Sequence, residues 1–374
     1  MKKKILFLTG TRADFGKIKS LISILDNDPE FEVFVFVTGM HLQAVYGLTL
    51  IEIERCNFTN VHTFENNTHE TTMDLTLAKT IEGLSSYCKK VNPDLIVVHG
   101  DRIETLAGAI VGSLNNILVA HIEGGELSGT VDELIRHSVS KLSHIHFVSN
   151  DAAAGRLKQM GEIESSIHTI GSPDIDIMFS PNLPNIDVVK NYYQIPFENF
   201  AVVMFHPVTT EANAMKEYAH NFVSALQADA LNYVIIYPNN DLGSQCIIAE
   251  FHKLKDNARF RIIPSLRFEY FLTLLKNARF IIGNSSAGIR EAPYYGIPII
   301  NIGTRQQNRT INADIINVDY TTESILQALK NINSHSVQSF NNTFGEGNSA
   351  QLFLSTLQQS TFWEINQQKQ FKDL

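Results

Sequence analysis

The sequence predicts an α/β fold made of two Rossmann-like, doubly wound domains. Short apolar runs recur through the chain, each ending in Gly, Ser, His or Asp, with helix-length segments between them. Continuous apolar runs that alternate with helices are typical of parallel strands covered on both faces. The length, 374 residues, exceeds that of one ordinary domain and fits two of moderate size.

The apolar runs divide into two sets of five. We expect first-half strands at Ile5–Leu8, Val33–Val37, Leu95–Val98, Ile117–Ala120 and His146–Val148. We expect second-half strands at Ala201–Phe205, Tyr233–Ile236, Phe260–Ile263, Phe280–Ile282 and Ile297–Ile302.

The domain break is predicted near Gly171–Pro184, where GSPDIDIMFSPNLPN carries three prolines. The predicted domains are therefore residues 1–175 and 185–354. Residues 335–350, rich in Ser, Asn and Gly, are expected to form a loop. The final segment, residues 355–374, is predicted to hold a helix over Ser355–Phe371 that closes the second domain or crosses back to the first.

Composition narrows the function classes. A hydrophobic content of 44% and a charged content of 18% describe a globular protein with ample core material. A formal net charge of -9 argues against a nucleic-acid or membrane-surface role, because those need a positive footprint. A few local arginines and helix N-termini still suffice to bind a phosphorylated small molecule.

Several features predict a cytoplasmic location. The start, MKKKILFLTGTRAD, fits a first strand better than a signal peptide. No apolar segment reaches the ~20 residues that span a bilayer. Three widely separated cysteines indicate buried thiols in a reducing compartment.

Residues 121–144, HIEGGELSGTVDELIRHSVSKLSH, concentrate polar chemistry after a predicted strand. Open α/β sheets bind ligands where chain leaves the carboxyl ends of strands. Glu123 lies on the glycine-rich turn. In the helix that follows, Leu134, Ile135, Val139 and Leu142 form the apolar face, and Asp132, Arg136 and Ser140 share another. The alternative is a solvated loop and a surface helix with ion pairs.

Three other first-half strand ends carry polar residues. Arg12 and Asp14, in Gly-Thr-Arg-Ala-Asp, are expected to face the crevice, and the absence of GxGxxG gives no support for a nicotinamide cofactor. A lone histidine such as His41 is more often structural. Asp101, in His-Gly-Asp-Arg, either caps the next helix or pairs with the Glu123 turn. Closely placed carboxylates acquire different pKa values, as acid and base catalysts need.

The second half suggests a diphosphate site. His206 follows AVVMF and Asn239 follows VIIYP. Residues 281–293, IIGNSSAGIREAP, predict a strand, a small-residue turn and a helix start, where N–H groups and the helix dipole favour phosphate. Glu291 would accept hydrogen bonds from ribose, and Arg305 and Arg309 would add positive charge. A plain helix cap at Ser285 and Ser286 is the alternative. The chain has no HxxxH or CxxC pair, so we predict no metal site.

Nine motifs, in order along the chain, resemble one family. They are GTRADFGK, TGMHL, HGDRIETLAG, HIEGGELSGTVDELIRHSVSKLSH, FHPVTTE, YPNND, SLRFEYF, GNSSAGIREAP and GTRQQNR. Together they resemble the hydrolysing UDP-N-acetylglucosamine 2-epimerases of sialic acid and capsule polysaccharide biosynthesis. The resemblance weakens only after about residue 335. The non-hydrolysing branch carries GTRPE and HVEAG where this chain has GTRAD and HIEGG.

The resemblance implies a fold and a reaction. The fold is that of B-type glycosyltransferases, with the active site in the interdomain cleft. UDP and the proton on carbon 2 are eliminated to give 2-acetamidoglucal, and water then adds to release N-acetylmannosamine. No cofactor is implied, and members of the family are homodimers or homotetramers.

The resemblance also implies site residues. Asp101, Glu123 and Asp132 match essential carboxylates, and His206 matches an essential histidine. Asp101 and Glu123 are expected to act at carbon 2 and Asp132 on the added water, with acid and base unassigned. The expected substrate-binding residues are Arg12, Asp14, His41, Arg102, Arg136, Asn239, Arg267, Ser285, Ser286, Glu291 and Arg305.

Three alternatives remain open. The same reaction on a UDP-linked 2,4-diacetamido-trideoxyhexose would serve legionaminic acid synthesis. A glycosyltransferase of the same architecture would not need three crowded carboxylates. A non-catalytic nucleotide-sugar sensor would not need the intact set of carboxylates and His206.

Overall fold

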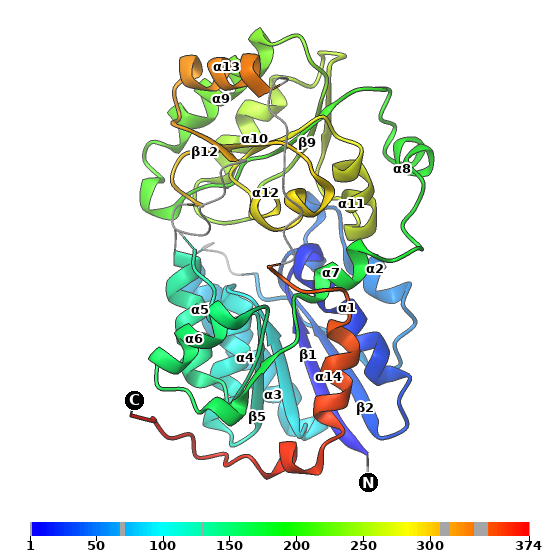
Figure 1. Ribbon diagram of the computed structural model, residues 1–374, viewed down its shortest axis with the longest axis vertical. Helices are drawn as coiled ribbons and strands as arrows, with labels where there is room; N and C mark the ends of the chain where they lie inside the picture. The colour runs from blue at the N-terminus through cyan, green and yellow to red at the C-terminus, as the bar shows by residue number, and fades with distance from the viewer. Residues whose placement is uncertain (1, 68–71, 129–130, 307–314, 333–342, 374) are drawn as a thin grey trace. The chain divides into compact units, whose positions relative to one another are not determined.

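The structure, a computed structural model, describes residues 2–67, 72–128, 131–306, 315–332 and 343–373 (Figure 1). The chain divides into two compact units. The first comprises residues 1–126, 132–180 and 343–374, and the second comprises residues 127–131 and 181–342. Each unit is built around one sheet whose strand pairs are all parallel.

Within its described residues, the first unit has a seven-stranded sheet in the order β3-β2-β1-β4-β5-β6-β7. The strands are β1 (Lys3–Thr9), β2 (Phe31–Val37), β3 (Val61–Thr63), β4 (Leu95–His99), β5 (Leu118–Ile122), β6 (Ile145–Val148) and β7 (Ile167–Thr169). The order reverses between β1 and β4, which is the topological switch point where doubly wound sheets bind ligands.

Helices cover both faces of this sheet (Figure 1). They are α1 (Arg12–Asp26), α2 (Leu50–Glu54), α3 (Met73–Val91), α4 (Ile103–Leu114), α5 (Val131–Leu142), α6 (Asp151–Gln159), α7 (Pro173–Met178) and α14 (Ser349–Leu357). Side chains such as Phe7 meet α1 and α14 on one face. On the other face α4 approaches closely, because a Cβ at Gly108 would lie 2.5 Å from Val98 Cγ1 and 2.9 Å from Leu8 Cδ2.

The second unit repeats the design. Its described residues form a six-stranded sheet in the order β10-β9-β8-β11-β12-β13. The strands are β8 (Ala201–Met204), β9 (Tyr233–Ile236), β10 (Phe260–Ile263), β11 (Ile281–Gly283), β12 (Ile299–Ile302) and β13 (Ile315–Val318). The helices are α8 (Ile186–Tyr193), α9 (Met215–Ala228), α10 (Ser244–His252), α11 (Phe268–Lys276), α12 (Ala287–Arg290) and α13 (Thr322–Asn331). Its switch point lies between β8 and β11.

The predicted α/β class is confirmed, and each of the ten predicted runs overlaps a strand. Sequence patterns missed β3, β7 and β13, all of which lie at sheet edges. An edge strand is covered less completely than a central one. Its residues therefore carry a weaker apolar signal, as in Val-His-Thr of β3 and Ile-His-Thr of β7.

The C-terminal segment differs from the prediction. The predicted second domain ran to residue 354, whereas residues 343–374 group with the first unit. Of the two predicted courses for residues 355–374, the structure has the one that crosses back to the first domain. Phe353 explains this, because its ring packs against Phe147 at 4.7 Å between centroids and Phe7 at 6.4 Å. The helix is also displaced: α14 ends at Leu357, whose carbonyl accepts a hydrogen bond from Trp363 Nε1 at 2.9 Å.

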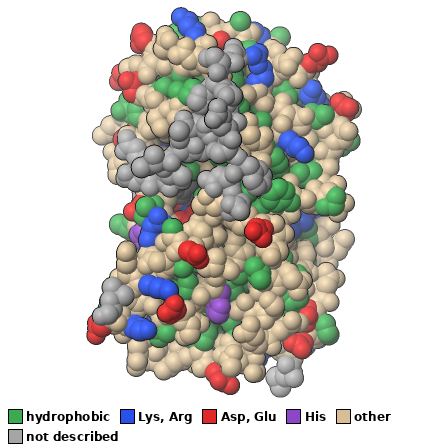
Figure 2. All heavy atoms as spheres, viewed as in Figure 1, with side chains coloured by type: hydrophobic (Ala, Val, Ile, Leu, Met, Phe, Trp, Pro, Cys, Tyr) green, Lys and Arg blue, Asp and Glu red, His purple; other side chains and the backbone are tan. Residues whose placement is uncertain are grey.

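The structure also describes the cysteines, the apolarity of the helices and part of the charged surface. Cys56, Cys88 and Cys246 are free thiols, and burial raises the pKa of Cys88 to about 12. In the part of the chain that the structure describes, no helix combines the length and apolarity of a membrane span. On the face drawn in Figure 2, Lys and Arg side chains lie scattered among Asp and Glu.

Replacing Phe353 tests the placement of the C-terminal segment. Phe353→Ala should destabilise the first unit by about 3–5 kcal/mol, because it removes a fully buried ring from the core. Leu352→Ala, at a neighbouring side chain that is 37% exposed, is the control and should cost about 1 kcal/mol or less. Trp363 is the only tryptophan of the chain, so urea unfolding followed by its fluorescence reports on this unit. Equal, small effects of both changes would contradict the placement.

Candidate functional site

The turn after β1 is held together by its own polar groups. Thr11 and Asp14 form a capping box at the start of α1, Gly10 N donates to Asp14 Oδ2 at 3.0 Å, and Thr9 Oγ1 bonds to Asp14 Oδ1. Burial of the carboxyl raises the pKa of Asp14, although the hydrogen bonds from Thr9 and Gly10 oppose this. The geometry therefore gives Asp14 a structural task in the turn, and its predicted position facing a ligand crevice stays a prediction.

His41 belongs to the same framework. It is fully buried, with Nε2 3.0 Å from Thr9 Oγ1 and Nδ1 2.7 Å from Thr49 Oγ1. Burial, together with the nearby charge of Arg12, lowers the pKa of His41 to about 3. With both ring nitrogens engaged inside the protein, His41 supports the turn. Its predicted contact with substrate stays a prediction.

Arg12 and Arg102 lie where the chain leaves β1 and β4 of the first unit. The Arg12 side chain lies 3.6 Å from Glu52 Oε1 and is 12% exposed. Arg102 is the N-cap residue of α4, and its Nε lies 3.4 Å from Glu104 Oε2. The cap position therefore does not fall on Asp101, whose carboxylate serves another purpose.

Arg136 joins the carboxyl ends of β4 and β5. Its guanidinium is 4% exposed, pairs with the Asp101 carboxylate and donates from NH1 to the Glu123 carbonyl oxygen at 2.5 Å. Asp132 lies one helical turn earlier on α5, so both residues face the same way. Arg136 thus joins the Asp101 carboxylate to the backbone of Glu123, and the pairing of the two carboxylates stays a prediction.

The Glu123 side chain is fixed by two residues that the sequence analysis did not single out. His99 Nε2 lies 3.3 Å from Glu123 Oε2, and Ser172 Oγ donates to Oε1. The carboxylate is almost completely buried, and the backbone of Glu123 has φ +63°. A left-handed conformation is costly for a residue other than glycine, and such strain is concentrated at functional sites.

His121, on β5, contacts both the turn that carries Asp101 and helix α5. Its Nε2 lies 2.8 Å from the Gly100 carbonyl oxygen, next to Asp101, and its Nδ1 lies 3.1 Å from Ser140 Oγ on α5. A Cβ at Gly124 would lie 2.9 Å from His121 Nδ1, so the glycine makes room for this ring. The signal for His121 was present in the HIEGG motif, but its partners are distant in sequence.

In the second unit, His206 follows β8 and is held by Asn284. The Asn284 amide accepts from His206 N at 2.6 Å and donates to the His206 carbonyl oxygen at 2.8 Å. Asn239 N donates to His206 Nδ1 at 3.0 Å, so the proton of the neutral ring lies on Nε2. His206 is therefore preorganised to donate a hydrogen bond from Nε2.

The turn after β11 lies at the switch point of this sheet. Gly283 has φ +136°, and a Cβ there would lie 2.0 Å from the Met204 carbonyl oxygen. Ser285 Oγ accepts from Ala287 N at 3.3 Å. Arg305 NH1 and Gln306 Nε2 both donate to the Asn284 carbonyl oxygen, at 3.3 and 2.8 Å. Asn284 and Gln306, which the sequence analysis did not single out, thus join the β8, β11 and β12 ends.

The predicted helix start after this turn is a short one. α12 is one turn long and is followed by a 3₁₀ helix at Ala292–Tyr295, so its dipole is small. Ser286 caps it without a side-chain hydrogen bond, and Glu291, 3% exposed, lies at its end. Arg267 is the N-cap residue of α11 and lies over the Tyr270 ring at 4.8 Å. Arg309 lies outside the described residues.

Among the residues that the structure describes, no three His, Cys, Asp or Glu side chains gather as metal ligands would. The polar groups at the strand ends suit acid/base chemistry in the first unit and hydrogen bonding to an anion in the second.

Comparison with known proteins decides the family. The family model described as UDP-N-acetylglucosamine 2-epimerase matches residues 23–358. The chain belongs to the UDP-N-acetylglucosamine 2-epimerase family. A UDP-N-acetylglucosamine 2-epimerase of Neisseria meningitidis serogroup B is 48% identical to this epimerase-family chain, over 100% of this chain and 99% of the relative.

Other relatives have names that specify a different substrate or a biosynthetic role. A UDP-N,N'-diacetylbacillosamine 2-epimerase (hydrolyzing) of Legionella pneumophila is 34% identical over 94% of each chain. Polysialic acid biosynthesis protein P7 of Escherichia coli is 32% identical over 87% of this chain and 85% of the relative.

Solved structures support the two-domain fold. The UDP-GlcNAc 2-epimerase of Methanocaldococcus jannaschii in complex with UDP-GlcNAc and UDP has a TM-score of 0.80 at 22% identity, covering 95% of this chain and 99% of that one. A Neisseria meningitidis UDP-GlcNAc 2-epimerase bound to UDP-GlcNAc has a TM-score of 0.79 at 19% identity, with the same coverage. The UDP-N-acetylglucosamine 2-epimerase family and the α/β two-domain fold are confirmed, and the hydrolysing branch stays a prediction.

Proposed function

We propose that this epimerase hydrolyses its nucleotide sugar, converting UDP-N-acetylglucosamine and water to N-acetylmannosamine and UDP for sialic acid biosynthesis. The observation that carries the proposal is the linkage of Asp101 and Glu123 through Arg136 in a chain with GTRAD and HIEGG motifs. Relatives of 34% and 31% identity, whose names include "hydrolyzing", support the same branch.

The proposed first step is elimination. One carboxylate of the Asp101 and Glu123 pair removes the proton on carbon 2 while the bond from carbon 1 to the UDP oxygen breaks, which leaves 2-acetamidoglucal. Arg136 holds both residues from the side of α5, and His99 and Ser172 fix the Glu123 oxygens, so little reorganisation is needed. The opposite member of the pair is the proton donor for the second step.

The proposed second step is hydration. Asp132 activates or fixes a water molecule that adds at carbon 1, and a proton reaches carbon 2 on its other face. The partly exposed Asp132 suits this task, because a group that handles water must be reachable. The sum of both steps consumes one water and releases N-acetylmannosamine and UDP, with all atoms accounted for.

The second unit supplies the nucleotide contacts in this proposal. His206 donates from Nε2 to the departing diphosphate, and Arg305 offers its charge. Ser285 and Ser286 present hydroxyl groups, and Glu291 accepts from ribose hydroxyls. Asn239 and Arg267 complete the predicted set, with Asn239 contributing through its backbone N–H to His206. A cytoplasmic location and a homodimer or homotetramer stay predictions.

The products formed in heavy water test this function. Purified protein given UDP-N-acetylglucosamine should release free N-acetylmannosamine carrying deuterium at carbon 2, together with UDP, because the carbon proton exchanges during elimination and hydration. NMR of the sugar and chromatography of the nucleotide give the answer. UDP-N-acetylmannosamine with the nucleotide still attached would refute the hydrolysing proposal. Faster turnover of a UDP-linked 2,4-diacetamido-trideoxyhexose would favour the alternative substrate.

Substitutions of the carboxylates test their roles. Asp101→Asn, Glu123→Gln and Asp132→Asn should each lower kcat by at least ~100-fold, the scale of lost acid/base catalysis, while UDP affinity by calorimetry stays close to that of the unchanged protein. Glu133→Gln, adjacent to Asp132 on α5, is the matched control and should keep its activity. Near-normal kcat in all three variants would remove the carboxylate mechanism.

A further inference from the structure

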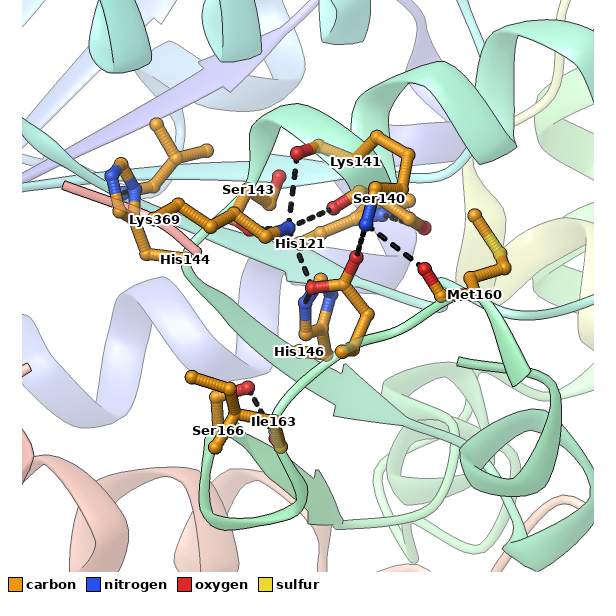
Figure 3. Close-up of polar contacts among 12 residues, drawn as sticks. His121, Ser140, Lys141, Ser143, His144, His146, Met160, Ile163, Ser166 and Lys369 are labelled. Carbon is orange, nitrogen blue, oxygen red and sulfur yellow. Dashed lines mark hydrogen bonds and ion pairs between the residues drawn. The ribbon is translucent and has the colours of Figure 1, made fainter. Parts of the chain in front are cut away.

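Lys369, close to the C-terminus, lies against the C-terminal end of α5 (Figure 3). His144 Nε2 lies 3.0 Å from the Gln367 carbonyl oxygen, and Lys372 N donates to the Gly161 carbonyl oxygen at 3.1 Å. These two contacts fix the chain on either side of Lys369, whose side chain turns toward the helix end in Figure 3.

Lys369 caps α5. Its Nζ donates to the carbonyl oxygens of Ser140 at 2.9 Å, Lys141 at 3.0 Å and Ser143 at 2.6 Å. The last carbonyls of a helix lack partners within the helix, and a cation there also interacts favourably with the helix dipole. A single ammonium group thus joins three acceptors at the end of α5, of which the Ser140 carbonyl oxygen also accepts from Ser143 N at 3.2 Å.

A buried carboxylate holds Lys369 in this position. Only 1% of the Glu162 side chain is exposed. Its Oε2 lies 2.5 Å from Lys369 Nζ and 3.0 Å from His146 Nε2, and its Oε1 lies 2.7 Å from Lys141 Nζ. Burial opposes ionisation, yet hydrogen bonds from His146 and both lysines lower the pKa of Glu162 to about 2. The carboxylate is therefore charged at neutral pH and pairs with the cap.

The other end of α5 carries the groups proposed for catalysis. Arg136 lies about one turn and Asp132 about two turns ahead of Ser140 on the helix. Ser140 itself contributes its carbonyl oxygen to Lys369 and its hydroxyl to His121, which holds the Gly100 carbonyl oxygen beside Asp101. A shift of α5 along its axis would therefore move the Arg136 guanidinium away from both of its partners.

We propose that Lys369 is a positioning residue for the epimerase reaction: by capping α5 it holds Arg136 where it fixes Asp101 and Glu123. This inference rests on the proposed function, because that function gives these carboxylates their roles. The family match ends at residue 358, so the cap is a feature of this chain beyond the matched region.

The experiment compares Lys369→Met, Lys369→Arg and Lys372→Met in the full chain. Lys369→Met keeps the length of the side chain and removes its charge. It should lower kcat roughly tenfold, since displacements of about 1 Å at a reacting group have effects of this order or larger. KM and the UDP dissociation constant should change less than twofold. Lys369→Arg keeps the cation and should recover most of the lost kcat. Lys372→Met, at an exposed lysine of the same segment, should behave like the unchanged protein.

Hydrogen exchange measured by mass spectrometry provides the second readout. Peptides covering residues 131–142 should exchange faster in Lys369→Met and not in Lys372→Met. This measurement needs no substrate, so it separates the two proposals. If the unchanged protein fails to release N-acetylmannosamine, the proposed function is refuted. If hydrogen exchange over α5 is the same in Lys369→Met as in the unchanged protein, the role of the cap is overturned. A kcat for Lys369→Met within twofold of normal, equal losses in the Met and Arg variants, or a parallel loss of UDP binding would also overturn it.

Discussion

The buried guanidinium of Arg136 is the interaction on which the first unit's site depends. It connects the Asp101 carboxylate after β4 with the Glu123 carbonyl after β5, and it reaches both from α5. A buried cation needs such partners, because its loss of hydration must be compensated by charge and hydrogen bonds. The same group therefore joins the end of β4, the end of β5 and α5.

In the second unit, the side-chain amide of Asn284 holds the ends of neighbouring strands together. Asn284 bonds to both backbone groups of His206, and its carbonyl oxygen accepts from Arg305 and Gln306. Asn284 follows β11 and His206 follows β8, the two strands that flank the switch point. In each unit a buried polar group thus holds the ends of neighbouring strands, while the apolar sheets supply a rigid base.

Most of the fold was predictable because central parallel strands are apolar on both faces. Edge strands such as β3 escaped detection, since Val-His-Thr has no continuous apolar run. Phe353 was assigned to the wrong domain because its partners, Phe7 and Phe147, lie more than 200 residues earlier in the chain. A pattern within a window cannot show such a contact.

The site was predictable in part. Asp101, Glu123 and Arg136 were found from motifs at strand ends, and the structure links them. His99 and Ser172 were missed, since only the fold brings Ser172 to a carboxylate 49 positions away. Lys369 was missed because a lysine among glutamines near the C-terminus has no local signature. Conversely, His41 belongs to a family motif yet is enclosed by Thr9 and Thr49.

The coupling between Arg136 and Asp101 tests the central claim most directly. It is measured by a double-mutant cycle on kcat with Arg136→Met, Asp101→Asn and the combined variant, each checked for folding by circular dichroism. If the guanidinium acts by holding the carboxylate, the combined variant should be about as slow as the slower single variant. A loss equal to the product of the two single losses would show that the residues act independently, which would contradict the account.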